Sequence, residues 1–96
     1  MKAHSEDRFT IRERERDVAA ATAAVETARA QVSQAQAAYH EAAKNARRIK
    51  TLVQEGTVSR ADGDHAEAQR ESTRATVTAV QATLRQAIDQ RGETGA

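Results

Sequence analysis

The chain has 96 residues with a net charge of +1, and 39% of its residues are hydrophobic while 30% are charged. Ala supplies 22 of the hydrophobic residues, which leaves too few large side chains for a thick globular core but favours closely packed helices. Balanced charge and scarce aromatic residues argue against a dedicated nucleic-acid binder, and zero Cys excludes a disulfide framework.

Residues 1–10 are polar and aperiodic, so we predict a flexible lead-in there. No stretch of the chain approaches the roughly 18 apolar residues that a membrane span requires. The first twelve residues also lack the apolar core of a signal peptide. We therefore expect neither a signal peptide nor a membrane anchor in this chain.

A first helix is predicted from about residue 11 to about residue 54. Small and apolar residues recur there in alternating steps of three and four, which is typical of a coiled coil. No Pro occurs in the chain and the first Gly is Gly56, so nothing interrupts this helix. The seam residues are Val18, Ala21, Val25, Ala28, Val32, Ala35, Tyr39, Ala42, Ala46, Ile49 and Val53.

A tight turn is predicted at about residues 55–59. Gly56 follows the periodic run directly, and Gly at that place adopts a positive φ without penalty. Ser59 with Asp62 three residues later resembles a capping box, in which each residue satisfies a backbone N–H of the other. Because a short connection makes neighbouring helices antiparallel, the pattern predicts a hairpin.

A second helix is predicted at about 60–91, followed by a flexible tail at 92–96. Its seam comprises Ala66, Arg70, Thr73, Val77, Val80, Leu84 and Ala87, and it is weaker near the turn, where Gly63 and Arg70 fall close to the line. A second stripe lies beside it, formed by Ala68, Ala75, Ala79 and Ala82. This stripe either packs against a further helix or only raises helix propensity on an exposed side.

The sequence therefore predicts an all-α fold, a two-helix antiparallel coiled-coil hairpin with unequal arms. Residues before Thr22 have no partner in the second helix. They fray, pair with another chain, or belong to a longer structure.

Catalytic and metal-binding patterns are weak. His4, His40 and His65 do not share a helix face at the spacing of a two-histidine metal site. Asp62 and Asp64 lie beside His65, but acids in a first helical turn commonly complement the helix dipole. A two-helix rod also offers no concave site that excludes water. We expect no enzyme activity, no metal and no cofactor.

The stretch AARRIKTLVQEGTVSRADGDHAEAQ around the turn resembles the hairpin tip of periplasmic adaptor proteins, also called membrane-fusion or HlyD-like proteins. That tip carries an Arg, a Leu four residues later and a Ser seven residues further on, and Arg48, Leu52 and Ser59 fit this spacing. The resemblance covers about residues 18–90. It implies a periplasmic protein of tripartite efflux or type I secretion systems.

The resemblance also implies that the tip docks onto an outer-membrane channel, with polar contacts from Arg48 and Ser59 and an apolar contact from Leu52. Several copies would pack side by side into a tube, and no nucleic acid or small molecule would bind directly. The lipoyl, β-barrel and membrane-proximal parts of such adaptors are absent, so we expect an isolated hairpin.

Each of the three tip residues also has a purely structural explanation. Arg48 suits the end of a helix, Leu52 closes the seam, and Ser59 caps the second helix. The alternative hypothesis is a generic coiled-coil protein that oligomerises through its heptad seam and has no partner for its tip.

Overall fold

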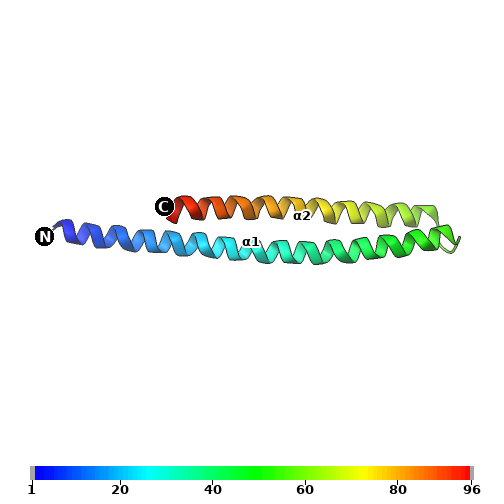
Figure 1. Cartoon of the computed structure of the whole chain (residues 1–96), viewed down its shortest axis with the longest axis horizontal. Helices are drawn as coiled ribbons and strands as arrows, with labels where there is room; N and C mark the ends of the chain where they lie inside the picture. Colours follow the sequence, from blue (N-terminus) through cyan, green and yellow to red (C-terminus); the bar gives the residue numbers. More distant parts are fainter. Residues whose placement is uncertain (1, 96) are drawn as a thin grey trace.

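A computed structural model describes the backbone of residues 2–95 and the side chains of residues 8–94. It contains two helices, α1 (Lys2–Gln54) and α2 (Arg60–Gly95), and no strand within the described residues. The helices pack against each other in antiparallel directions along the whole length of α2 (Figure 1). The all-α hairpin predicted from the sequence is confirmed.

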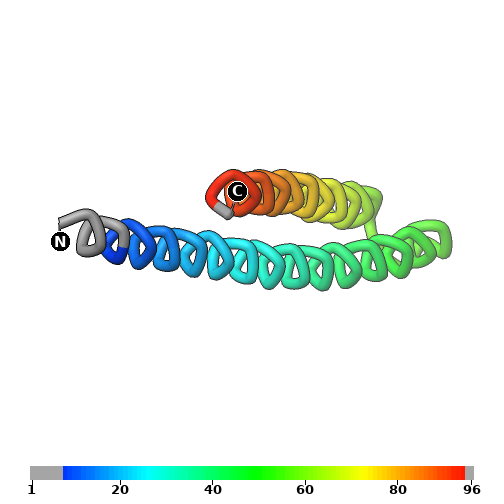
Figure 2. The backbone as a smooth tube through the Cα atoms, turned by 60° about the vertical axis from the view of Figure 1, so that its left-hand side comes forward, coloured from blue at the N-terminus to red at the C-terminus, as the bar shows by residue number. Residues whose placement is uncertain are grey.

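The molecule is a thin rod that measures 83 × 14 × 13 Å. Its length is that of α1 alone, because 53 residues in an α-helix extend about 80 Å. α2 has 36 residues against 53 in α1, so α1 extends well beyond the C-terminal end of α2 (Figure 2). The turn between the helices forms one end of the rod.

The core is a single seam between the helices, and it is made mostly of Ala. Its buried residues are Val25, Ala28, Ala35, Ala43, Ala46 and Ala66. Four of them are seam positions of the predicted heptads in α1, and the other seam positions from Ala21 onward are half-buried. Because Ala has only a methyl group, the two backbones approach closely enough to exclude water from this line.

The seam of α2 also follows the predicted line. Ala66 is buried, and the remaining predicted seam residues of α2 are half-buried. Gly63 extends the seam toward the turn, since a Cβ on Gly63 would lie only 3.0 Å from Cγ2 of Val53. The second Ala stripe of α2 is exposed, which places it outside the hairpin core.

Both helices are longer than expected from the sequence. α1 is helical from Lys2 rather than from about residue 11, and α2 continues through Gly92 to Gly95. Polar residues do not stop a helix in the absence of Pro, so each helix extends past the last seam residue that its partner covers. Residues 1 and 96 lie outside the described part, and the flexibility predicted for 1–10 and 92–96 stays a prediction.

The part of α1 that has no partner begins where α2 ends. Every described side chain from Arg8 to Ala20 is exposed. Phe9, Ile11 and Val18 are the exposed large hydrophobic residues of this segment, at 65%, 55% and 37% of their full accessible surface. The overhang predicted before Thr22 is therefore present, and within the described residues nothing covers its apolar side chains.

No helix in the described part of the chain combines the length and the apolar character needed to cross a membrane.

Candidate functional site

The end of α1 is closed by a hydrogen-bonded turn centred on Gly56. Gly56 has a φ of +76°, the left-handed conformation that favours glycine. The N–H of Gly56 donates to the carbonyl of Val53 at 3.0 Å, and the N–H of Thr57 donates to the carbonyl of Leu52 at 2.9 Å. This pair of bonds is a Schellman motif, which satisfies carbonyl groups that the end of a helix otherwise leaves unpaired.

The start of α2 is closed by a reciprocal cap between Ser59 and Asp62. The N–H of Asp62 donates to Oγ of Ser59 at 3.1 Å, and the N–H of Ser59 donates to Oδ2 of Asp62 at 3.3 Å. The Asp62 carboxylate also lies in the first turn of α2, where the helix dipole stabilises negative charge. The two helix ends are thus fixed by backbone and cap interactions within a few residues.

The fixed turn holds the three predicted contact residues near one end of the rod. Arg48 and Leu52 are four residues apart in α1 and therefore lie on the same side of this helix. Arg48 and Ser59 are exposed, whereas Leu52 is half-buried. Leu52 partly closes the seam while it keeps some apolar surface accessible at the end of the rod.

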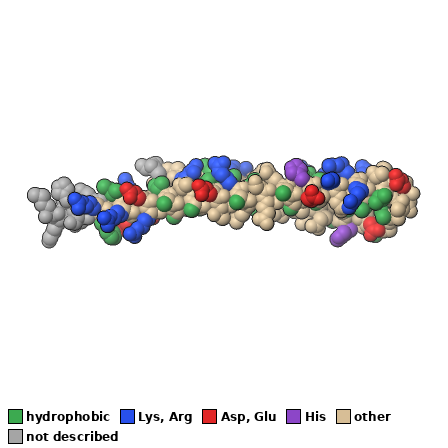
Figure 3. Space-filling view, turned by 90° about the horizontal axis from the view of Figure 1, so that it is seen from below, with side chains coloured by type: hydrophobic (Ala, Val, Ile, Leu, Met, Phe, Trp, Pro, Cys, Tyr) green, Lys and Arg blue, Asp and Glu red, His purple; other side chains and the backbone are tan. Residues whose placement is uncertain are grey.

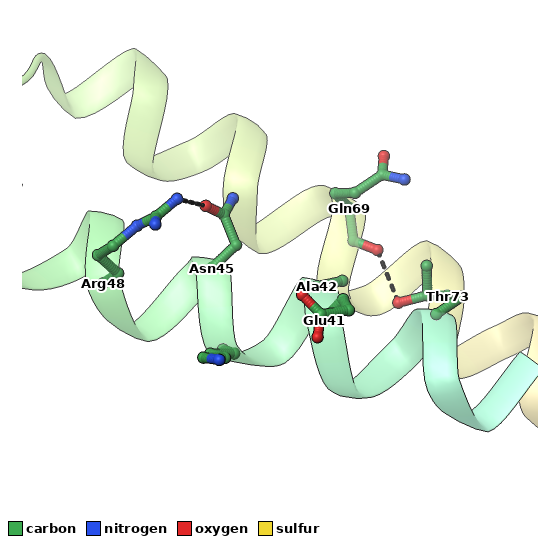
Figure 4. Close-up of a pocket in the computed structure, with 8 residues that line it drawn as sticks. Glu41, Ala42, Asn45, Arg48, Gln69 and Thr73 are labelled. Carbon is green, nitrogen blue, oxygen red and sulfur yellow. Dashed lines mark hydrogen bonds between the residues drawn. The ribbon is translucent and has the colours of Figure 1, made fainter.

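Arg48 lies at the edge of a shallow groove between the helices. The groove is lined by Ala38, Glu41, Ala42, Lys44, Asn45, Arg48, Gln69 and Thr73. Nη2 of Arg48 donates to Oδ1 of Asn45 at 2.7 Å, so a neutral side chain holds the guanidinium group (Figure 4). Within the described residues Arg48 forms no ion pair, and its charge is available to a partner.

The opposite side of the hairpin carries a different arrangement around Arg70. Nε of Arg70 donates to Oε1 of Glu67 at 2.8 Å, and Arg70 also forms ion pairs with Glu67 and Glu71. The hydrogen bond that Arg70 donates to Glu67, together with the negative charge of Glu67, raises the pKa of Arg70, and Tyr39 of α1 contributes in the same direction. An arginine in the seam is thus tolerated because acidic neighbours on its own helix neutralise it.

The described side chains provide no cluster of His, Asp and Glu that could hold a metal ion. Asp62 is engaged with Ser59, which fits its role as a capping residue. His40 is exposed beside Tyr39, and His65 is exposed at the start of α2. His4 lies outside the described side chains.

Two residues shape the tip in ways that the sequence pattern does not predict. Gly63 weakens the heptad pattern of α2, yet its missing side chain provides the room that Val53 occupies. Asn45 lies one turn before Arg48 on the same face of α1 and accepts its hydrogen bond. The sequence gives the spacing of these residues along each helix, but only the packed structure shows in which direction each side chain points.

The fold is thus a helical hairpin whose turn is closed by hydrogen bonds at both helix ends. Residues 24–90 match the family described as "RND MFP, alpha-helical hairpin domain". This match covers more than half of the chain, so the chain belongs to this family of membrane fusion proteins. The resemblance seen in the sequence is confirmed, and the family is one of structural, periplasm-facing adaptors. No curated protein and no solved structure is significantly similar to the chain.

Proposed function

We propose that this hairpin serves in the periplasm as part of an adaptor of a tripartite efflux pump, and that its tip docks onto an outer-membrane channel. Membership of the RND membrane fusion proteins favours efflux over type I secretion. The length of the rod suits a spacer that carries a small contact surface far from its other end.

The observation that carries this proposal is the state of Arg48. Arg48 is exposed near the turn, where hydrogen bonds cap both of the adjoining helix ends. Its side chain is positioned by neutral Asn45 rather than by an acid. A guanidinium group positioned in this way is ready to bind a carboxylate or a row of carbonyl oxygens on a partner. Leu52 supplies an apolar contact on the same side of α1.

The tip of one hairpin is too small for tight binding by itself. Stable protein interfaces bury about 800 Å² on each partner, and the tip consists of one turn and the adjoining helix ends. Affinity must then come from several hairpins that bind one channel together, as in other multivalent systems. We propose side-by-side self-association of hairpins for this reason, and the exposed stripe of Ala68, Ala75, Ala79 and Ala82 would allow close approach of a neighbour.

The proposal is tested by binding of hairpins to a purified outer-membrane channel of a tripartite pump. The hairpins are immobilised at high density on a biosensor surface, so that one channel can reach several tips. We expect Arg48→Ala and Leu52→Ala to reduce channel binding at least about tenfold, because the loss at each tip is multiplied over several contacts. Arg47→Ala is the matched control, since Arg47 is also exposed but lines a groove on the other side of the hairpin.

Ser59 requires its own control because it also caps α2. Ser59→Ala removes the cap bond to Asp62 together with any contact to the channel. Ser59→Asp keeps a capping oxygen but replaces the hydroxyl that a partner would meet. Loss of binding in both variants, with the fold of Ser59→Asp intact by circular dichroism, supports a contact role. Parent-like binding of the Arg48, Leu52 and Ser59 variants would refute docking through this tip.

A generic coiled-coil protein without a tip partner remains the alternative, and the exposed apolar residues of the overhang favour it. Phe9 and Ile11 are more than half exposed, so another chain could cover them. Analytical ultracentrifugation distinguishes the two functions when it is combined with the channel assay. Self-association that depends on Phe9 and Ile11, without any binding to the channel, would support the alternative.

A further inference from the structure

The middle of α2 differs from the rest of the hairpin in the kind of residue that forms the helix. Within residues 72–83, seven of the twelve are β-branched or carry a short hydroxyl: Ser72, Thr73, Thr76, Val77, Thr78, Val80 and Thr83. Such residues lose side-chain freedom in a helix or compete with its backbone for hydrogen bonds. The helix is therefore intrinsically weak at this point.

The threonine hydroxyls of this section bond to the helix backbone itself. Oγ1 of Thr76 donates to the carbonyl of Ser72 at 3.2 Å, and Oγ1 of Thr78 donates to the carbonyl of Arg74 at 3.4 Å. Thr83 bonds to the carbonyl of Ala79 at 3.3 Å. Oγ1 of Thr73 donates to the carbonyl of Gln69 at 3.0 Å (Figure 4) and also to the carbonyl of Arg70 at 2.9 Å. Each hydroxyl shares a carbonyl with a backbone N–H, an arrangement that weakens and bends helices.

Packing offers this section little compensation. No side chain between Ser72 and Thr83 is buried, and its seam residues are only half-buried. In α1, Ala35 is the only buried residue between Ala28 and Ala43. The flanking sections contain more buried residues. Ala43, Ala46 and Ala66 are buried toward the tip, and Val25 and Ala28 are buried toward the other end.

Charge does not support the section either. Residues 75–84 of α2 and 30–40 of α1 contain no Lys, Arg, Asp or Glu, although 30% of the chain is charged. Figure 3 accordingly shows a mostly tan stretch with little red or blue just to the right of the middle of the rod. Ion pairs between successive helical turns are thus not available within residues 75–84, whereas Arg70 is paired with Glu67 and Glu71 closer to the turn.

We infer that residues 72–83 of α2 form a compliant section, where the hairpin opens and bends before either flank does. Local opening is easiest where few apolar groups are buried and backbone bonds face solvent. The section lies between the closed tip and the overhang end, so bending there tilts the tip without disturbing its turn or its cap. This inference concerns the hairpin itself and holds whether or not the tip docks.

Hydrogen–deuterium exchange of the full chain, read by mass spectrometry, tests the inference. We expect backbone amides of residues 73–83 to exchange roughly tenfold faster than those of residues 63–71. The variant Thr76→Ala/Thr78→Ala/Thr83→Ala should slow exchange in this section roughly tenfold, because Ala is the strongest helix former and removes the hydroxyl bonds. All three threonines are exposed, so the hairpin core is unchanged.

Thr51→Ala is the matched control. Thr51 is exposed in α1 near the tip, and its hydroxyl also donates to a carbonyl of its own helix, that of Arg47 at 3.3 Å. We expect this variant to leave exchange of residues 73–83 unchanged. Three results would overturn the inference: exchange at 73–83 no faster than at 63–71, no slowing in the triple variant, or equal slowing by Thr51→Ala.

Discussion

The close approach of the helices at Gly63 leads to a prediction that opposes ordinary helix propensity. An Ala in place of Gly inside an exposed helix normally stabilises a protein by about 1 kcal/mol. At Gly63, however, the new Cβ would lie 3.0 Å from Cγ2 of Val53, where carbon atoms prefer about 3.5–4.0 Å. Val53 cannot rotate away cheaply, because a valine in a helix has one strongly preferred side-chain rotamer.

The net effect follows from these two opposed contributions. Overpacking of a closely fitted site costs about 1–3 kcal/mol, which cancels or exceeds the gain in propensity. We expect Gly63→Ala to leave the free energy of unfolding unchanged or to lower it by up to about 2 kcal/mol. The measurement is urea unfolding followed by far-UV circular dichroism.

Two further variants make the reasoning refutable. Gly92 is also helical but a Cβ there meets nothing within 4 Å, so Gly92→Ala should stabilise by a few tenths to about 1 kcal/mol. Adding Val53→Ala to Gly63→Ala removes the clash, and the two changes should be non-additive by about 1 kcal/mol. If Gly63→Ala stabilises the hairpin as much as Gly92→Ala does, the close approach at the tip is wrong.

Five other substitutions test the tip and the seam by the same unfolding measurement. Gly56→Ala should destabilise by about 1–2 kcal/mol, because the positive φ is strained for Ala; an unchanged midpoint would contradict the turn. Ser59→Ala and Asp62→Ala should each cost about 1 kcal/mol and less than the sum together, since they share one reciprocal cap; full additivity would argue against it. Arg70→Leu should raise the urea midpoint, because an apolar side chain suits the half-buried seam position better than a charged one; a lower midpoint would show that the ion pairs matter more. Arg48→Ala should change stability by less than about 0.5 kcal/mol, as is usual for exposed residues, and a larger loss would assign Arg48 a structural role.

The fold was predictable because its determinants are periodic and local. Seam residues such as Val25, Ala28 and Ala46 recur at a fixed spacing, so their common face follows from helix geometry alone. The break between the helices was equally readable, because Gly56 and Ser59 are residue types that end and begin helices.

The remaining features depend on how the two helices fit together. The predicted helix limits at residues 11 and 91 followed the seam, whereas a helix without Pro continues past its last packed residue. Gly63 interrupts the apolar pattern of the second helix, and the sequence does not show that its missing side chain leaves room for Val53 on the first helix. The docking role of Arg48, Leu52 and Ser59 stays a prediction, because it concerns a surface of another protein.

The pairing of the two helices around the turn is tested most directly by a disulfide between positions 53 and 63. The chain has no natural Cys, so Val53→Cys/Gly63→Cys creates a single possible intramolecular bond. A Cβ at position 63 would lie 4.0 Å from Cβ of Val53, within the roughly 3.5–4.5 Å that disulfides require. We expect rapid formation of the intramolecular bond in the monomer under mild oxidation, seen by mass spectrometry. In one unbroken helix the two positions would lie about 15 Å apart, so a variant that forms only intermolecular bonds or none would contradict the hairpin.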